Sequence, residues 1–273
     1  TKNLVGAFKW NSNFNIAFSD NRVLALSEIS DQLVTYSSRV STITKVGGRI
    51  GQFYGPVQEG VYVDQQDFDN SPKMVNSEVG TIKFKDINKD GVITLVDVDG
   101  DKTEIGNPLP KFIFGFTNNF SYCNFDLSIV MAGSYGNKVM ATEEGITNLD
   151  GVFNVLKDVK DRWRSPENPG AGKYGKSTGA TEPDRNPHSR CVYDGSNLTI
   201  KNVTLGYNIP IKTKNISNIR VYGSIQQLYV FTEYPYGNPE AGVDSDGNSP
   251  NPLLQGIDNS TYPVPRTFTI GLS

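Results

Sequence analysis

The sequence predicts an all-β protein built from long strands joined by polar loops. Apolar and polar residues alternate with a period of two along several segments, which is the pattern of strands with one apolar face and one polar face. The composition points the same way, with 27 Gly, 15 Pro, 13 Tyr and 14 Phe residues. Such a mixture favours strands and turns over helices.

The first three strands follow directly from this alternation. In WNSNFNIAF, residues 10–18, one face carries Trp10, Phe14, Ile16 and Phe18, and the other carries Asn11, Asn13 and Asn15. The segments KFIFGFTNNFSY (111–122) and NFDLSIVMAGS (124–134) repeat the pattern on either side of Cys123-Asn124. A two-residue connection between alternating segments predicts a β-hairpin.

Three later segments are predicted as strands for the same reason. They are SNLTIKNVTLGYNI (196–209), NIRVYGSIQQLYVFT (218–232) and RTFTIGLS (266–273). Long polar loops are expected at 64–80, 165–190 and 233–264, and such lengths are uncommon in compact soluble domains unless the loops have a function.

The best helix candidate is 147–163. Its apolar residues fall at helical spacing, at Phe153, Leu156, Val159 and Trp163. We expect a short helix that packs this stripe against a neighbouring loop.

Two architectures share this local pattern. A soluble β-sandwich buries one face of each strand in a core, whereas a membrane barrel turns that face to lipid. The strands are long enough to cross a bilayer when tilted, and aromatic residues stand at their ends, as interface girdles do. These residues are Trp10, Phe18, Phe112, Tyr122, Tyr207 and Phe231.

Composition narrows the class of protein further. The chain has 273 residues, a net charge of −3 and a pI near 5.3, so no nucleic-acid partner is predicted. The mean hydropathy is −0.39 and no apolar run reaches the ~20 residues of a membrane helix. Cys123 and Cys191 allow either one disulfide or two free thiols. The chain begins at Thr1 rather than Met, which predicts a fragment or a processed product.

The stretch DINKDGVIT, residues 86–94, is the one candidate metal site. Oxygen ligands at alternate positions followed by glycine are how a calcium loop of the EF-hand kind begins. The predicted Ca²⁺ ligands are Asp86, Asn88, Asp90, the carbonyl of Val92, and Asp97 at the twelfth position. The alternative is a polar turn whose Asp and Asn side chains cap their own backbone.

A calcium sensor is not predicted, because no amphipathic helix pair flanks the loop. An ion there would stiffen the loop, with Asp99 and Asp101 as nearby carboxylates. A second cluster, DSDGN at 244–248, is predicted to be a plain turn.

Other candidate sites are weaker. His188 is the only histidine, so we expect a surface residue and not a triad or a zinc site. Glu143-Glu144 is interpreted as part of a solvated loop and not as a glycosidase pair. Packing is favoured over sugar stacking for the loop tyrosines Tyr174, Tyr234, Tyr236 and Tyr262. The protein is predicted not to be an enzyme.

Longer motifs carry a resemblance to a known family. GTIKFKDINKDGVIT (80–94) and IGNPLPKFIFGFTNNFSYCNFDLSIVMAGSYGN (105–137) resemble the C-terminal barrel region of SusC/RagA-type TonB-dependent outer-membrane transporters of Bacteroidetes. Further matching motifs follow in order: WNSNFNIAFSDNRVLAL, GGRIGQFYGPVQEGVY, DRWRSPENPG, DGSNLTIKNVTLGYNIP, RVYGSIQQLYVFTEY and GIDNSTYPVPRTFTIGLS. Each motif is weak alone, but their order and spacing cover nearly the whole chain.

The resemblance implies the C-terminal part of a large antiparallel transmembrane β-barrel with long extracellular loops. Residues 1–273 would form a single partial domain, completed by an N-terminal portion not in this chain, because a barrel of about 22 strands encloses a plug in this family. The plug and the TonB box would lie upstream of Thr1. The chain also ends without the terminal aromatic residue usual in such barrels.

The implied function is TonB-dependent import of an oligosaccharide or oligopeptide across the bacterial outer membrane. The implied partners are a SusD-like surface lipoprotein, TonB acting through the absent N-terminal part, the rest of the barrel and outer-membrane lipid. No cofactor is required. The alternative is a secreted soluble β-sandwich that binds carbohydrate or calcium.

Overall fold

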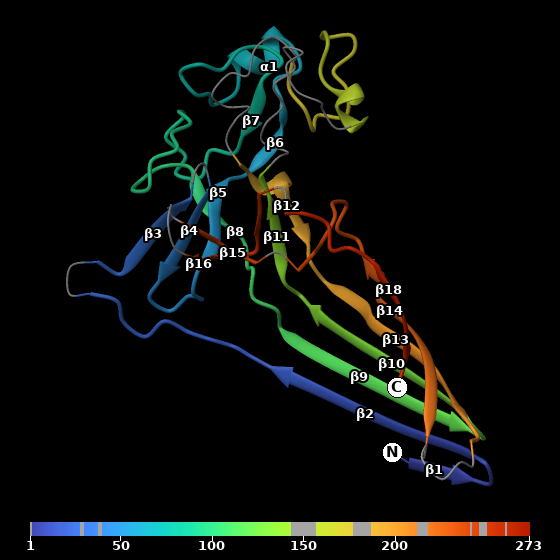
Figure 1. Ribbon diagram of the computed structural model, residues 1–273. Coiled ribbons are helices and arrows are strands. Elements are labelled where there is room, and N and C mark those ends of the chain that lie inside the picture. The colour runs from blue at the N-terminus through green and yellow to red at the C-terminus, as the bar shows by residue number, and fades with distance from the viewer. Residues whose placement is uncertain are drawn as a thin grey trace.

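The computed structural model describes residues 2–27, 30–37, 40–142, 157–176, 187–211, 218–240, 242–245, 250–259 and 261–273. It consists of one long sheet and a group of loops that fold together at one end of that sheet (Figure 1). Among the described residues, no helix is long and apolar enough to cross a membrane.

The main sheet has seven strands in the order β1-β2-β9-β10-β13-β14-β18, and every neighbouring pair is antiparallel. The bounds are β1 Lys2–Val5, β2 Phe8–Phe18, β9 Phe112–Tyr122, β10 Phe125–Tyr135, β13 Asn197–Ile209, β14 Ile219–Thr232 and β18 Thr267–Leu272. The strands predicted from alternation are therefore confirmed to within a few residues.

The predicted hairpin at Cys123-Asn124 is also confirmed. Tyr122 pairs with Phe125, which leaves two residues in the turn. Cys123 has a φ of 51°, the positive value that a two-residue turn between twisted strands demands. Cys123 is exposed and Cys191 is buried, and both are free thiols.

The connections between the long strands contain short elements of their own, where the sequence predicted polar loops and one helix, at 147–163. The first connection holds β3 Gln32–Ser37, β4 Val40–Lys45, β5 Gln52–Pro56, β6 Gln58–Val61, α1 Gln65–Asp69, β7 Ile82–Phe84 and β8 Lys102–Gly106. The second holds β11 Lys138–Ala141, η2 Lys157–Asp161, η3 Ser189–Cys191 and β12 Val192–Asp194. The third holds β15 Val243–Ser245, β16 Pro250–Gln255 and β17 Ile257–Asp258.

These three connections share one hydrophobic core, and we call them together the loop cap. The core residues are Val40, Phe53, Met140, Cys191, Leu254 and Ile257. β11 and β17, from different connections, pair in parallel in a sheet that also includes β12. Backbone pairing and a joint core hold the connections together, so the loop cap is a packed unit and not a set of independent loops.

The predicted helix 147–163 is only partly within the described residues. The part that the structure describes, Lys157–Asp161, is a short 3₁₀ helix with Val159 buried. Trp163 follows it and donates its indole N–H to the carbonyl of Val63 at 2.9 Å. The predicted contact with a neighbouring loop is thus confirmed for Trp163, but the α-helical geometry is wrong in the described part of this segment.

The apolar face of the main sheet also carries polar residues, Asn118 and Ser12 among them. Asn118 is 6% exposed and pairs with Ser12 of β2. The indole Nε1 of Trp10 donates to its Oδ1 at 3.1 Å, and the Trp10 ring stacks on Phe120 with centroids 6.0 Å apart. Trp10 therefore covers a polar group that would otherwise face an apolar environment.

We expect Trp10→Phe to destabilise the sheet by about 1–3 kcal/mol, because Asn118 loses its donor while it stays buried. Denaturant unfolding of the complete protein in lipid vesicles would measure this. The matched control is Trp10→Phe combined with Asn118→Leu, which removes both partners and should recover most of the loss. If Trp10→Phe and the double variant were equally stable, the hydrogen bond between Trp10 and Asn118 would contribute nothing to stability.

Candidate functional site

The main sheet has one apolar and one polar face, and cross-strand register keeps them separate. Phe14 pairs with Phe116, Ile16 with Phe114, and Phe18 with Phe112. The apolar face continues through β14 and β18, where Phe268 and Ile270 are 69% and 88% exposed. So large an exposed apolar surface marks a face that contacts lipid or another protein.

Aromatic pairs mark the two ends of this apolar face. Phe112 packs against Phe18 and Tyr135 at one end, and Phe125 packs against Tyr207 at the other. At about 3.3 Å per residue the ten-residue step from Phe112 to Tyr122 spans about 33 Å along β9. A strand tilted by roughly 40° would then cover about 25 Å, the height of the apolar band of a membrane barrel.

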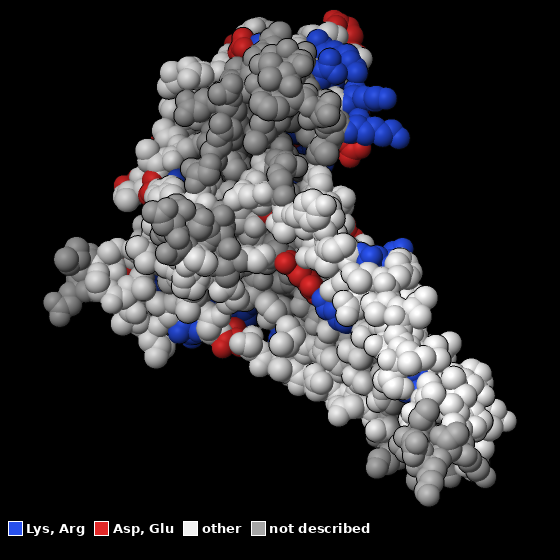
Figure 2. Space-filling model, viewed as in Figure 1, with Lys and Arg blue, Asp and Glu red and all other residues white. Residues whose placement is uncertain are grey.

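The opposite face carries two rows of uncharged polar side chains that run across the strands, and we call them the polar rows. The first row consists of directly paired residues, Asn11, Asn119, Ser128, Thr204, Ser224 and Thr269. The second row is Asn13, Thr117, Asn202, Gln226 and Thr267, with the apolar Val130 between Thr117 and Asn202. Figure 2 shows that charged residues are sparse over the main sheet and gather around the loop cap.

This face carries the exposed Lys9 of β2 and one close pair of opposite charges. Near the Cys123 turn, Arg220 Nε donates to Asp126 Oδ1 at 3.0 Å and Arg220 Nη2 to Asp126 Oδ2 at 2.5 Å. The guanidinium also lies over the Tyr222 ring, 5.2 Å from its centroid. A bidentate pair of this kind fixes geometry and leaves little net charge for a ligand.

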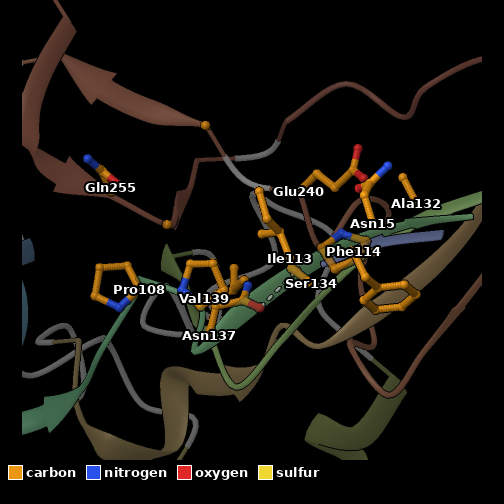
Figure 3. A pocket seen from close by; sticks show the side chains of 16 residues that line it. Asn15, Pro108, Ile113, Phe114, Ala132, Ser134, Asn137, Val139, Glu240 and Gln255 are labelled. Carbon is orange, nitrogen blue, oxygen red and sulfur yellow. Dashed lines mark hydrogen bonds between the residues drawn. The ribbon is translucent and has the colours of Figure 1, made fainter. Parts of the chain in front are cut away.

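At the end of the long strands away from the Cys123 turn, the loop cap and the sheet line an open cavity of about 520 Å³ (Figure 3). The floor comes from the main sheet and includes Asn15, Gly115 and Ser134. The cap contributes polar and apolar groups from separate connections: Pro108, Asn137, Val139, Pro239, Glu240 and Gln255. A cavity of this size is within the range of small-molecule sites.

A β-bulge in the sheet places Lys201 beside Glu240 of the cavity wall. Lys201 is skipped in the pairing of β13 with β10, where it is the extra residue of the bulge. Its Nζ lies 2.7 Å from both carboxylate oxygens of Glu240. Sequence reasoning missed this pair, because no local pattern links a strand lysine to a glutamate in a loop 39 residues away.

The predicted metal ligands Asp86, Asn88 and Asp90 do lie together. The Asp86 carboxylate accepts the backbone N–H groups of Lys89 and Gly91 at 2.6 and 3.0 Å. Asn88 Oδ1 accepts from the Asp90 N–H at 3.0 Å, and Asp90 Oδ1 accepts from the Val92 N–H at 2.8 Å. The loop therefore folds as a series of side-chain-to-backbone turns that places three oxygen-bearing side chains near one another.

Asp97, the fifth predicted ligand, has other partners. Lys102 Nζ lies 2.5 Å from its Oδ1, and the Tyr36 hydroxyl donates to its Oδ2. Burial disfavours the charged carboxylate, but the hydrogen bonds from Lys102 and Tyr36 outweigh burial and hold the pKa of Asp97 below its usual value. Asp97 is thus ionised and paired with a cation on the neighbouring strand β8.

Asp101, which was not among the predicted ligands, lies at the buried centre of the loop. It is 0% exposed, and its carboxylate accepts from the N–H groups of Ile87 and Thr94 at 2.7 and 2.8 Å. Across the described residues, no group of three or more His, Cys, Asp and Glu side chains is placed to hold a metal ion. A Ca²⁺ site would have to draw on Asn88 and backbone carbonyls as well, and it stays a prediction.

The structure tests the positions predicted for His188 and for two of the loop tyrosines. His188 is 4% exposed and packs edge-to-face against Phe84, so the expected surface position is wrong. Phe84 is far from His188 in sequence, so no local pattern reveals this contact. Packing is confirmed for Tyr174 and Tyr234, which are 5% and 4% exposed.

The remaining expectations fall partly outside the described residues. Glu143-Glu144 and most of the DSDGN segment lie there. Tyr236 packs edge-to-face against Tyr193 and Tyr234, whereas Tyr262 is 85% exposed.

The chain is similar to curated receptors along almost its full length. It is 31% identical to TonB-dependent receptor P3 of Formosa agariphila over 97% of this chain and 26% of that protein. It is also 31% identical to TonB-dependent receptor P26 of the same organism, over 97% of this chain and 27% of the relative. No family model matches the sequence. The chain spans about a quarter of the length of these relatives.

The chain is a segment related to the TonB-dependent receptors. The receptor segment also shares its fold with the solved RagAB peptide transporter, with a TM-score of 0.73 and 17% identity over 99% of this chain and 27% of that chain. A second RagAB structure, the importer in its open-open state, gives a TM-score of 0.72 at 17% identity. The resemblance predicted from the sequence is confirmed.

The main sheet of this receptor segment is accordingly a section of the wall of a large antiparallel transmembrane β-barrel. In such a barrel an apolar face turns to lipid and a polar face turns to the lumen. The position of the segment as the C-terminal part of the barrel, with plug and N-terminal domains elsewhere, stays a prediction.

Proposed function

We propose that the complete receptor imports a large substrate, an oligosaccharide or an oligopeptide, across the bacterial outer membrane with energy supplied through TonB. The observation that carries this proposal is the two-faced wall, which is apolar outside and polar inside, with loops folded over the inner surface. Such a wall creates an aqueous path with a binding surface and does no covalent chemistry. The curated relatives named above are receptors.

We further propose that a SusD-like surface lipoprotein covers the loop cap. The packed core shared by the three connections supports this part of the proposal, because a rigid extracellular surface suits a protein partner. Affinity purification of the complete receptor from its natural membrane should recover one lipoprotein in stoichiometric amount.

Uptake by cells tests the import proposal. Fluorescent neutral oligosaccharides and oligopeptides would be supplied to cells with the receptor, without it, and with the receptor but without TonB. We expect accumulation of one probe class in the first cells alone. Equal accumulation in all three would contradict import by this receptor.

We also propose that residues 86–97 bind Ca²⁺ weakly and that the ion stiffens the loop. The grouping of Asp86, Asn88 and Asp90 supports this proposal, and the pairing of Asp97 with Lys102 argues for low affinity. We expect protection of the loop from proteolysis with a midpoint of roughly 0.1–1 mM Ca²⁺, as in extracellular calcium modules. Asp86→Asn should abolish the protection and Asp99→Asn should leave it, whereas identical digestion with Ca²⁺ and with chelator would contradict a site.

A further inference from the structure

A second cavity opens on the main sheet at the end that meets the loop cap, where β10, β13 and β14 lie side by side (Figure 1). Its volume is about 560 Å³, and we call it the outer pocket. The lining includes three aromatic residues and three polar ones: Tyr135, Tyr229, Phe231, Asp194, Ser196 and Glu233. This cavity is separate from the one in Figure 3 and shares none of these residues with it.

Strand register places the aromatic residues of the outer pocket on the apolar face of the sheet. Tyr135 pairs with Phe112, and Tyr229 pairs with Ile200, which pairs in turn with Met131. All three aromatic side chains are slightly more than half exposed. In a membrane barrel this face turns to lipid, and aromatic residues at its end mark the level of the headgroups. The outer pocket therefore opens toward lipid at that level.

The aromatic side chains are already fixed by their neighbours. Tyr135 stacks on Phe112 with ring centroids 5.1 Å apart, and Tyr229 packs edge-to-face on Phe231 at 4.7 Å. Just before Tyr229, Gln227 has a φ of 52° and no partner on β13, so β14 is irregular at this point. Irregularities of this kind turn the side chains that follow in a new direction. A ligand would meet a surface that needs little ordering.

The polar side of the outer pocket carries one carboxylate that the protein leaves unmatched. Asp194 is paired, because Lys138 Nζ lies 3.0 Å from its Oδ2 and the Ser196 N–H donates to its Oδ1 at 2.8 Å. Glu233 is exposed, and among the described residues no ion pair or hydrogen bond engages its carboxylate. The described lining includes no Lys or Arg, so Glu233 gives the pocket an acidic character.

Cations do occur beside the outer pocket, at the same end of the wall. Lys111 precedes β9, and its backbone N–H donates to the carbonyl of Tyr135 at 2.8 Å. Arg266 precedes β18, which pairs with β14. Both are exposed and neither lines the pocket. A positive group is thus favoured within the pocket, and a negative group is favoured next to it.

A carboxylate beside aromatic rings suits an ammonium group. The ring faces of Tyr229 and Phe231 attract a cation, and the Glu233 carboxylate accepts its N–H groups in charge-assisted hydrogen bonds. A primary ammonium brings three N–H donors, whereas a quaternary ammonium brings none. The carboxylate therefore selects a primary ammonium over a quaternary one.

We propose that the outer pocket binds the headgroup of a membrane lipid that carries a primary ammonium next to a phosphate. The ammonium lies between Glu233 and the aromatic rings, and the acyl chains lie along the apolar face of β10, β13 and β14. The occupant is a lipid and not a soluble amine, because the pocket opens on the face that a barrel turns to lipid. This inference concerns the outside of the wall and does not rest on the import proposal.

Native mass spectrometry of the complete receptor tests the proposal. Delipidated receptor in detergent would be mixed with equal amounts of phosphatidylethanolamine, phosphatidylcholine and phosphatidylglycerol that have the same acyl chains. We expect the ethanolamine lipid to be retained about tenfold better than the other two, because it alone donates N–H groups to a carboxylate. Glu233→Gln should remove this preference.

Three further variants make the result specific. Tyr229→Leu keeps apolar surface but removes the ring and should weaken retention of the ethanolamine lipid roughly threefold. Glu233→Lys reverses the charge and should favour phosphatidylglycerol. Glu59→Gln makes the same change as Glu233→Gln at an exposed position on β6, outside the pocket lining, and should have no effect. Heat-modifiable migration on electrophoresis would verify that each barrel is folded.

Two results would overturn the proposal: equal retention of the three lipids, or an ethanolamine preference that persists in Glu233→Gln. An excess of free phosphoethanolamine should leave the lipid bound. Displacement by that soluble amine would assign the outer pocket to a water-soluble ligand and would overturn the lipid as its occupant. The uptake assay tests import separately, and its result does not depend on any of these outcomes.

Discussion

Phe53→Ala is expected to loosen the whole loop cap by about 3–5 kcal/mol. Phe53 is 0% exposed and belongs to the core in which the three connections meet. Its removal leaves a cavity between Met140 and Leu254, which belong to different connections, and the lost contacts are those that join the connections. None of these core residues lies on a long strand of the barrel wall.

Hydrogen exchange on the complete receptor would measure the effect. Amides of β4, β5 and β11 should exchange a hundredfold faster or more in the variant, since each 1.4 kcal/mol corresponds to a tenfold change. Amides of β9 and β10 should be unchanged. Leu24→Ala is the control, because Leu24 lies on the first connection and is 85% exposed. Unchanged exchange in β11 would show that the connections are not joined through Phe53.

The wall of the barrel could be predicted from the sequence because its signal is local. Alternation from Trp10 to Phe18 fixes both the strand and its two faces, and register then places Asn11 beside Asn119. Two residues between alternating segments were enough to predict the turn at Cys123. Apolar and polar residues alternate in such strands because one face meets lipid and the other meets water.

The loop cap could not be predicted in the same way. Its core joins Val40, Met140 and Leu254, which lie on different connections and carry no shared periodicity. His188 is buried by Phe84 for the same reason, and Glu240 reaches Lys201 only because a bulge and a distant loop meet. Contacts set by tertiary packing leave little trace in the sequence around each residue.

In the predicted calcium loop, residues 86–97, the spacing of residues likewise failed to predict the partners of single side chains. Spacing placed Asp97 at the twelfth position of a calcium loop, yet the structure pairs it with Lys102 and Tyr36. Spacing gave Asp101 no particular role, yet its carboxylate is the buried centre of the loop. Spacing identifies residues that are able to bind an ion, and competing partners decide which of them are available.

Asp101→Asn should therefore destabilise this loop by about 1–3 kcal/mol, although it changes only one atom. The carboxylate accepts N–H groups from Ile87 and Thr94 on its two oxygens. An asparagine amide must turn an NH₂ group toward one of them, which leaves a buried backbone N–H without an acceptor.

Exchange of the Ile87 and Thr94 amides in the complete receptor is the direct measurement, and it should accelerate roughly tenfold to a hundredfold. Asp99→Asn makes the same change of charge and shape two residues earlier, at an exposed side chain, and should leave both amides protected. The comparison separates the hydrogen bonds from net charge, since both variants lose one carboxylate. Equal acceleration in the two variants would mean that charge, and not the buried acceptor, holds the loop together.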